Sequence, residues 1–331
     1  MLPPSRERHG RSHSRLPSPV PRPPLTFPVR RYSYLTTDVF TSRRFGGNPL
    51  AVLPDARGLT TEEMHAITRE FNYSESTFIL PPDDPRHTRR VRIFTPGGEV
   101  PFAGHPTVGS ALVLAATGAI PLDADETRIV FEEGVGPVPV TIRRVGGVPS
   151  FAELSVAKLP EVLPPAPSAE QLAPMLSLGA DDMLGGSFHP QAVTCGLPFT
   201  FVPVRSRDAV RRARLRLDLW ESTLAPTAAS MVMVFAMDAE DPAHQVRARM
   251  FAPGESVPED PATGSACAAL GGYLGMRSAT AGGTLRWIVE QGYEMGRPSL
   301  LHVACDKSGG AITAVRVGGE AVLVCEGTIT V

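Results

Sequence analysis

A ten-residue segment occurs twice in this chain, and the repeat limits the folds that the chain can adopt. The segment Arg92-Ile-Phe-Thr-Pro-Gly-Gly-Glu-Val-Pro101 matches Arg249-Met-Phe-Ala-Pro-Gly-Glu-Ser-Val-Pro258 at six positions, all at one offset of 157 residues. Each copy is followed by a short polar turn and an Ala-rich run, which begin at His105-Pro-Thr in the first copy and Pro261-Ala-Thr in the second. This period is far longer than that of a solenoid, so the repeat predicts one duplication that produced two similar domains.

The length of the chain agrees with a duplication. At roughly 100–200 residues per domain, 331 residues correspond to two domains, and a hydrophobic content of 42% is enough to build a core in each. A Pro-rich connector at residues 159–167 is the best candidate for the boundary. We therefore expect an N-terminal domain at residues 31–158, with residues 320–331 as a candidate strand to complete it, and a C-terminal domain at residues 159–319.

The N-terminal segment differs in composition from the rest of the chain. Residues 1–30 contain eight prolines and six arginines, and Glu7 is their only acid. Such a segment buries too little apolar surface to offset its ordering entropy, so we predict that it is disordered. It could be a basic targeting or nucleic-acid arm, but we favour a leader without a role, because it lacks an apolar core and a regular amphipathic pattern.

Charge and cysteine content exclude several classes of protein. The formal net charge of −2 does not suit a nucleic-acid or anionic-membrane partner. Stretches without a charged residue or a histidine, such as residues 223–237, are shorter than the roughly 18 residues of a membrane span. The chain has no C-x-x-C pair, which makes a structural zinc site improbable. Its cysteines are too few for a disulfide framework, so we expect a reducing, cytoplasmic location; they are Cys195, Cys267, Cys305 and Cys325.

Local patterns in the first half predict both strands and helices. The capping box Thr60-Thr-Glu-Glu63 predicts a helix that ends near Phe71, and a second helix is expected after Gly104, where apolar residues recur at helical spacing. Alternating or continuous apolar runs predict strands, of which the first two should pair antiparallel; they lie at residues 32–40, 48–53, 76–80, 90–94, 127–131 and 138–143.

The two repeated turns are candidate binding elements. A helix start leaves N–H groups unpaired and carries roughly half a positive charge, so it binds carboxylate or phosphate readily. Two such turns across a cleft would hold a small anionic substrate. The alternative is that their Ser, Thr and Pro residues only cap helices, but the duplication favours binding. The donors would be Gly104, His105 and Thr107 in one turn and Thr263, Gly264 and Ser265 in the other.

Three ionisable residues lie in or beside these turns. His105 is inside the first turn, although a single histidine is more often a satisfied polar residue than a catalyst. Asp260 precedes the second turn, where an N-cap role is a fair alternative. Glu75 follows a predicted helix end and could equally be a solvated loop acid. Nucleotide, nicotinamide, zinc-protease and α/β-hydrolase motifs are missing from the sequence.

Six motifs give the chain from residue 31 to residue 331 a family resemblance. It resembles the phenazine-biosynthesis PhzF-like isomerase family in Asp38-Val-Phe-Thr, Gly47-Asn-Pro-Leu-Ala-Val, Asn72-Tyr-Ser-Glu-Ser-Thr-Phe78, Phe102-Ala-Gly-His-Pro-Thr-Val-Gly, Glu259-Asp-Pro-Ala-Thr-Gly-Ser-Ala and Gln291-Gly-Tyr-Glu-Met-Gly-Arg-Pro-Ser299. The resemblance implies the α/β (α+β) fold of diaminopimelate epimerase. In that fold, two pseudo-symmetric domains each wrap a curved, mostly antiparallel sheet around a central helix.

The resemblance also implies an activity, without a metal or cofactor. Glu75 resembles the family's general acid/base, His105 and Asp260 its polar partners, and Gly264 and Ser265 its substrate-binding helix start. The implied protein is a homodimeric isomerase that moves a proton between carbons of a small carboxylate in the interdomain cleft. Enclosure of Glu75 by Phe78 and other apolar groups would raise its pKa toward neutrality, which suits a reversible proton carrier.

Two other functions are weighed against this one. An amino-acid epimerase or racemase related to this fold would use two thiols, but the first turn offers His105, and Cys267 lies inside the second helix as an expected small core residue. A non-catalytic protein that binds a small ligand or a partner in the same cleft is the second alternative. The presence of all three ionisable residues counts against it.

Overall fold

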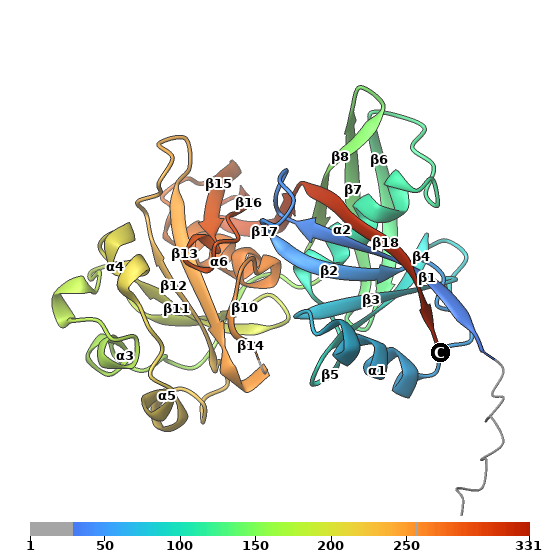
Figure 1. Cartoon of the computed structure of the whole chain (residues 1–331). Coiled ribbons are helices and arrows are strands. Elements are labelled where there is room, and N and C mark those ends of the chain that lie inside the picture. The colour runs from blue at the N-terminus through green and yellow to red at the C-terminus, as the bar shows by residue number, and fades with distance from the viewer. Residues whose placement is uncertain (1–28, 256) are drawn as a thin grey trace, which may run out of the picture.

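Two buried helices, α2 (Gly104–Ala116) and α6 (Gly264–Arg277), form the centres of the two halves of the molecule. The computed structural model describes residues 29–255 and 257–331. Every residue from 104 to 115 of α2 and from 264 to 275 of α6 is buried. Both helices have small or apolar residues on most of their faces, and such helices are stable only in the interior of a protein. Figure 1 shows the two lobes, each with its strands around one of these helices. The predicted fold of two similar α/β domains is confirmed.

The first lobe wraps α2 in a mostly antiparallel sheet. Its strands are β1 (Arg31–Val39), β2 (Asn48–Leu53), β3 (Glu75–Leu80), β4 (Arg89–Thr95), β5 (Gly98–Val100), β6 (Glu126–Glu133), β7 (Gly136–Val145) and β8 (Val148–Ser155). Only the β2–β3 and β4–β6 pairs are parallel within this lobe. Helix α1 (Thr61–Phe71) packs outside the sheet on β3 and β4.

The second lobe repeats this pairing order around α6. Its elements are β9 (Glu161–Val162), α3 (Ala169–Met175), β10 (Gln191–Thr194), β11 (Pro198–Pro203), α4 (Arg207–Arg212), α5 (Leu217–Thr223), β12 (Met231–Ala236), β13 (Val246–Ala252), β14 (Val257–Asp260), β15 (Gly283–Gln291), β16 (Ser299–Ser308) and β17 (Ala311–Gly319). The parallel pairs are β11–β12 and β13–β15, the counterparts of those in the first lobe. The duplication therefore includes the whole strand order and is not limited to the repeated segment.

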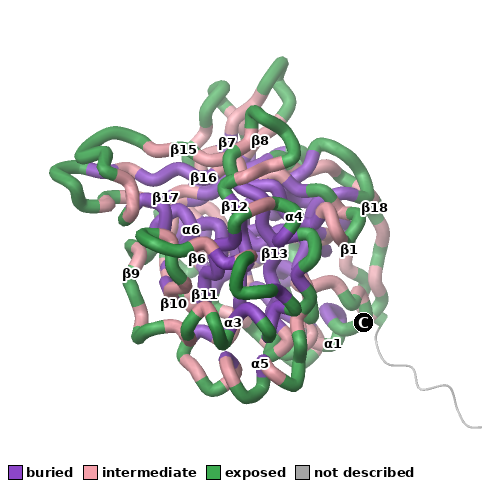
Figure 2. The backbone as a smooth tube through the Cα atoms, turned by 90° about the vertical axis from the view of Figure 1, so that its left-hand side faces the viewer, coloured by how far each residue is buried: buried purple, intermediate pink, exposed green. Residues whose placement is uncertain are grey.

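Two strand pairings link the two halves of the chain. Strand β8 pairs antiparallel with β17, which joins the two sheets edge to edge. The last strand, β18 (Ala321–Thr330), returns to pair with β1 along its whole length. Figure 2 shows that the buried backbone gathers in the interior around α6, β12 and β13, whereas the peripheral loops are exposed. Within residues 29–255 and 257–331, the helices all lack the length or the apolar character of a membrane span.

Most local predictions for the first half are confirmed, with one boundary corrected. The capping box is present: Thr60 Oγ1 accepts from Glu63 N, and Glu63 Oε2 accepts from Thr60 N. Residues 1–28 of the predicted leader lie outside the described residues. Arg30 is the last residue of the predicted leader, but its backbone N–H and C=O groups both bond to Val331. It therefore belongs to the folded part of the chain. Its guanidinium group also contacts Glu63.

A second repeat is only four residues long, which is too short to be distinguished from chance in the sequence alone. Asp84-Pro-Arg-His87 and Asp241-Pro-Ala-His244 recur at the same offset of 157 residues. Each loop is held by a glutamate at the end of a strand, which accepts two backbone N–H bonds and a bond from His Nδ1 at 2.8 Å. The two glutamates are Glu132 in β6 and Glu290 in β15.

The residue after each of these glutamates differs between the halves. Gln291 lies after Glu290 and donates from Nε2 to Thr263 Oγ1. Glu133 lies after Glu132 and contacts Thr107 Oγ1 at 2.6 Å, while its second oxygen is buried without a hydrogen-bond partner. Burial raises the pKa of Glu133 to about 8. The first half thus holds a buried acid where the second half has a neutral amide.

This difference predicts a pH-dependent effect of Glu133→Gln on stability. Because the pKa of Glu133 is higher in the folded chain than its ordinary 4.5, its contribution to the free energy of unfolding is present below pH 4.5 and is lost toward pH 8. The amide should remove this loss, so the variant should gain roughly 1–3 kcal/mol over the parent at pH 8.5 and less at pH 5. Urea denaturation at both pH values measures the gain.

The exposed Glu70 on α1 provides the matched control. Glu70→Gln should change the free energy of unfolding by a similar small amount at both pH values. An equal gain for Glu133→Gln at pH 5 and pH 8.5 would show that Glu133 is ionised in the folded protein.

Candidate active site

The starts of the two central helices are in contact. A Cβ atom built on Gly104 would lie 2.6 Å from Gly264 Cα and 2.8 Å from Ser265 N. A Cβ atom on Gly264 would lie 3.0 Å from Gly104 Cα. Any side chain at Gly104 would push the helices apart, so glycine is required there by the close approach of the two backbones. The structure therefore brings together the two turns that the sequence repeat identified.

Neither helix start is capped by a side chain. The N-cap residues are Ala103 for α2 and Thr263 for α6, and neither side chain bonds to the first turn of its helix. The first turns contain no acidic residue. In α6 the first helical bond runs from Cys267 N to Thr263 O, so the amides of Gly264 and Ser265 precede it. These amides and the helix dipole can act on an anion beside them.

A cavity of about 110 Å³ lies between the two lobes beside these helix starts. An engineered cavity of about 150 Å³ in another protein holds benzene, so this one suits a molecule no larger than a single ring. Its polar lining includes Ser74, Glu75, Asp260, Thr263 and Ser265. Its apolar lining comes from both lobes and consists of Val100, Phe102, Ala103, Leu197, Phe199, Met231, Met250, Ala252 and Val257.

Glu75 is the first residue of β3 and faces His105 beside this cavity. The distance from Glu75 Oε2 to His105 Nε2 is 3.5 Å, and both atoms are buried without a hydrogen-bond partner. The side chain of Glu75 retains 18% exposure and lines the cavity. Burial raises the pKa of Glu75, and the negative charge of Asp260 raises it further. Burial lowers the pKa of His105 to about 3, so the imidazole is neutral.

Asp260 is the last residue of β14 and is held by both lobes. Its Oδ1 accepts from Asn48 Nδ2 at 2.9 Å, and its Oδ2 accepts from Thr263 Oγ1 at 2.5 Å. Gln291 fixes this corner by donating to Asp260 O and to Thr263 Oγ1. Burial raises the pKa of Asp260, although the bonds from Thr263 and Asn48 oppose the rise. Its N-cap role is not observed, since Asp260 binds Thr263 rather than the helix amides.

The sequence analysis did not assign Asn48, Ser74 and Gln291 to the site. Asn48 is fully buried and links His105, Asp260 and Ser74, as its amide bonds to all three. A signal for Asn48 was present in the sequence. The segment Gly47-Asn-Pro-Leu50 corresponds to Gly196-Leu-Pro-Phe199 in the second half, and a polar residue in place of the leucine marks a position with its own role.

Four predicted site residues are not among those that line the cavity: Gly104, His105, Thr107 and Gly264. Of these, Gly104, His105 and Gly264 lie at the two helix starts beside it. Thr107 does not line the cavity, because its hydroxyl group points to Ala103 O and Glu133 in the interior of the first lobe. The prediction that Phe78 encloses Glu75 is wrong: Phe78 packs against Phe94 in a separate core beneath α1. Successive residues of a strand point to opposite faces, and the apolar wall beside Glu75 comes from other strands. Cys267 is a buried free thiol within α6, as predicted.

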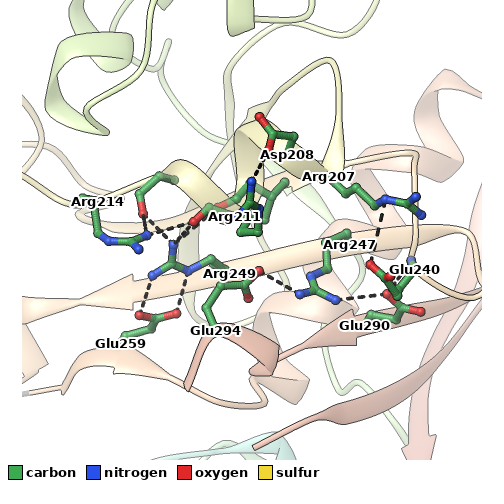
Figure 3. A network of polar contacts seen from close by, with 12 residues as sticks. Arg207, Asp208, Arg211, Arg214, Glu240, Arg247, Arg249, Glu259, Glu290 and Glu294 are labelled. Carbon is green, nitrogen blue, oxygen red and sulfur yellow. Dashed lines mark hydrogen bonds and ion pairs between the residues drawn. The ribbon is translucent and has the colours of Figure 1, made fainter. Parts of the chain in front are cut away.

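An ion pair positions the strand that carries Asp260. Arg249 of β13 donates from Nε and Nη2 to the two carboxylate oxygens of Glu259, at 2.7 and 2.8 Å, and from Nη1 to Ala213 O. Figure 3 shows this bidentate pair together with the more exposed pair of Asp208 and Arg211. Because Glu259 precedes Asp260, the Arg249 pair fixes the strand at the point where Asp260 enters the cavity.

A second arginine joins the lobes on the Asn48 side. Arg297 donates to Asp38 Oδ1 at 2.5 Å and to the carbonyl oxygens of Gly46 and Gly47. Gly47 has φ of +61°, and a Cβ atom there would lie 2.3 Å from Val39 O, so only glycine fits. These contacts place Asn48 at the start of β2, between the two helix starts.

Known proteins share this architecture along almost the whole chain. The family model described as phenazine biosynthesis-like protein matches residues 37–327. An uncharacterized isomerase of Mesorhizobium japonicum is 41% identical over 302 residues, which cover 90% of this chain and 98% of the relative. Trans-2,3-dihydro-3-hydroxyanthranilate isomerase of Pseudomonas aeruginosa is 33% identical over 297 residues, which cover 89% and 98%. Among solved structures, a phenazine biosynthesis protein of the PhzF family from Bacillus anthracis matches with a TM-score of 0.81 and 26% identity, covering 91% of this chain and 99% of that one.

The arginine pair predicts that Glu259→Gln destabilises the fold far more than loss of an exposed pair. Removing one partner of a fully buried ion pair costs roughly 3–5 kcal/mol, and the 18% exposure of the Glu259 side chain should bring the cost to the lower end. Urea denaturation of the variant measures this cost. Asp208→Asn, which breaks the exposed pairs with Arg211 and Arg212, is the control and should cost less than about 1 kcal/mol per pair. Equal costs would mean that the Arg249 pair does not hold β14.

Proposed function

This chain belongs to the phenazine biosynthesis-like (PhzC-PhzF) protein family and is an isomerase, and we propose that it moves a proton between two carbons of a small carboxylate substrate, with Glu75 as general acid and base. The single observation that carries the proposal is the position of the Glu75 carboxyl group. It lines a cavity of ring size, has one buried oxygen without a partner, and has a raised pKa.

A raised pKa suits a group that must both take and give a proton. A carboxylate with an ordinary pKa holds a proton too weakly to return it efficiently at neutral pH. Removal of water from Glu75 and the nearby charge of Asp260 both favour its protonated form. Glu75 can therefore exist in both states near neutral pH.

The reaction needs no oxidant or reductant. The Glu75 carboxylate takes a proton from a C–H group adjacent or allylic to the substrate carboxylate, and the electron pair of that bond moves into the carbon skeleton. The Glu75 carboxyl group then returns the proton to a second carbon, where the shifted electron pair forms the new C–H bond. Atoms and electrons balance within the substrate and one side chain.

The helix starts would bind the substrate and stabilise the transient negative charge. The lining of the cavity contains no lysine or arginine, so a substrate carboxylate would find backbone N–H groups and hydroxyl groups. The uncapped start of α6 supplies these donors, since Ser265 lines the cavity beside Asp260 and Thr263. Preorganised N–H donors are most effective where charge develops during the reaction.

Glu75→Gln tests this assignment. Without the carboxylate, the incorporation of solvent deuterium into substrate carbon should fall by roughly 100- to 10,000-fold, because general acid–base catalysis supplies rate factors of that size. Proton NMR in deuterated water follows the exchange. The first compound to test is trans-2,3-dihydro-3-hydroxyanthranilate, the substrate named for the Pseudomonas aeruginosa relative, followed by other small unsaturated, hydroxy and amino acids.

The control is again Glu70→Gln, whose side chain is exposed on α1 and should leave exchange unchanged. Exchange retained in Glu75→Gln would overturn the role of Glu75. A parent protein that binds compounds of the panel in thermal-shift assays but exchanges no proton with any of them would support the non-catalytic binding alternative.

The pH dependence of exchange tests the link between the two acids. Because the charge of Asp260 raises the pKa of Glu75, Asp260→Asn should let Glu75 ionise at lower pH. The pH at which residual exchange reaches half of its plateau should fall by about one unit. Glu255→Gln, which removes an acid that also lines the cavity, should not lower it. A midpoint that stays in place or rises in Asp260→Asn would show that Asp260 does not act on Glu75 through its charge.

A further inference from the structure

The amide of Asn48 has a fixed orientation. Its Nδ2 atom lies 2.9 Å from Asp260 Oδ1, 2.9 Å from Ala262 O and 3.2 Å from His105 Nδ1. Its Oδ1 atom accepts from Ser74 Oγ at 3.0 Å. A backbone carbonyl oxygen can only accept, so Ala262 requires the NH₂ side of the amide and excludes the flipped orientation.

This orientation decides which nitrogen of His105 carries the proton. The Asn48 NH₂ group has two protons to donate and no lone pair with which to accept. A proton on His105 Nδ1 would therefore face a second donor at 3.2 Å, inside a region closed to water. A bare Nδ1 avoids this conflict and can share one of the Asn48 protons. The neutral ring must then carry its proton on Nε2, the atom that faces Glu75 Oε2 at 3.5 Å.

We propose that Asn48 is a positioning residue that fixes His105 in the Nε2–H tautomer, so that the imidazole acts as a neutral hydrogen-bond donor beside Glu75 and not as a second base. The inference deepens the proposed function and rests on it for its chemical meaning. The tautomer itself follows from the contacts of Asn48 alone.

The surroundings of His105 agree with a neutral ring. The ionisable groups that face it are Glu75 from β3 and, through Asn48, Asp260 from β14. The start of its own helix disfavours a cation, because the helix dipole is positive there. The ring is 3% exposed, and this burial also lowers its pKa. Protonation of Nδ1 would need a partner that accepts, and Asn48 offers none.

A neutral donor in this place keeps the mobile proton on one group. If His105 accepted a proton from the substrate, two groups would compete for it, and the proton could leave the site through the imidazole. With its proton on Nε2, 3.5 Å from Glu75 Oε2, and its Nδ1 blocked, His105 can only act as a donor toward the Glu75 carboxylate. It therefore stabilises negative charge on Glu75 without exchanging a proton.

The tautomer can be measured directly in the intact protein. In protein labelled with ¹⁵N-histidine, two-dimensional correlation of ring protons with ring nitrogens distinguishes a protonated nitrogen from a bare one. For His105 we expect a bare Nδ1 and a protonated Nε2 that do not change from pH 5 to pH 9. His105→Gln identifies the signals by their disappearance.

The chain contains its own reference for the opposite tautomer. His87 and His244 direct Nδ1 to the carboxylate oxygens of Glu132 and Glu290, both at 2.8 Å, so each should show a protonated Nδ1 in the same spectrum. A protonated Nδ1 on His105, or an imidazole that titrates between pH 5 and pH 9, would overturn the proposal.

Two variants test the role of Asn48. Asn48→Asp replaces the donor with an acceptor, so the proton of His105 should move to Nδ1. Ser74→Ala removes the bond to Asn48 Oδ1 and leaves the NH₂ contacts in place, so the tautomer should be unchanged. An Nε2–H tautomer that persists in Asn48→Asp would refute the positioning role. Loss of exchange in Glu75→Gln is a separate readout, so failure of the general-base assignment and failure of the tautomer assignment can be told apart.

Discussion

The contact between the backbones at Gly104 and Gly264 is the constraint on which the rest of the site depends. Each of these glycines is the first residue of a helix that is buried on all sides, so neither helix can shift without disturbing the core of its lobe. Where the starts of two such helices meet, the N–H groups of two first turns and two positive dipole ends share one small volume. No single helix in the described ranges could produce this concentration of donors. The cavity beside it can therefore accept an anion even though no cationic side chain lines it.

The two halves kept the same framework and diverged at the few positions that face one another. Strand pairings, the Asp-Pro-x-His loops and the glycine that begins each central helix are duplicated, whereas the polar and ionisable residues around the helix starts are not. The first half contributes Glu75, His105 and Asn48, and the second contributes Asp260 and Thr263. The symmetric part provides rigidity, since each copy buries its own helix. In the function that we propose, the asymmetric part provides one proton carrier, Glu75, and one charged group that acts on it, Asp260. A strictly symmetric pair of halves would not distinguish these two roles.

The sequence predicted the part of this structure that depends on local chemistry and on self-similarity. The capping box before α1, the strands of the first half and the pairing of the two turns all follow from short patterns or from the repeat. Contacts that depend on three-dimensional packing did not follow. Phe78 was assigned to the cavity because it lies near Glu75 in the sequence, but strand alternation and pairing directed it into another core. Asn48 was overlooked because its partners at residues 105, 260 and 262 are brought to it only by the meeting of the lobes.

Electrostatics is consistent with the single mobile proton that the proposed function requires at a site with two acids and one histidine. Burial raises the pKa values of Glu75 and Asp260 and lowers that of His105, so desolvation favours the neutral form of each group. Hydrogen bonds then make the charged form more stable for one of the two acids than for the other. Asp260 accepts from Asn48 and Thr263, which stabilises its charged form, whereas Glu75 Oε2 has no such partner. These contacts favour Glu75 as the protonated acid of the pair, because burial raises its pKa and the charge of Asp260 raises it further. Asp260 acts on Glu75, and Asn48 on Asp260, from the opposite lobe, so the proton affinity of Glu75 depends on the contact between the two lobes.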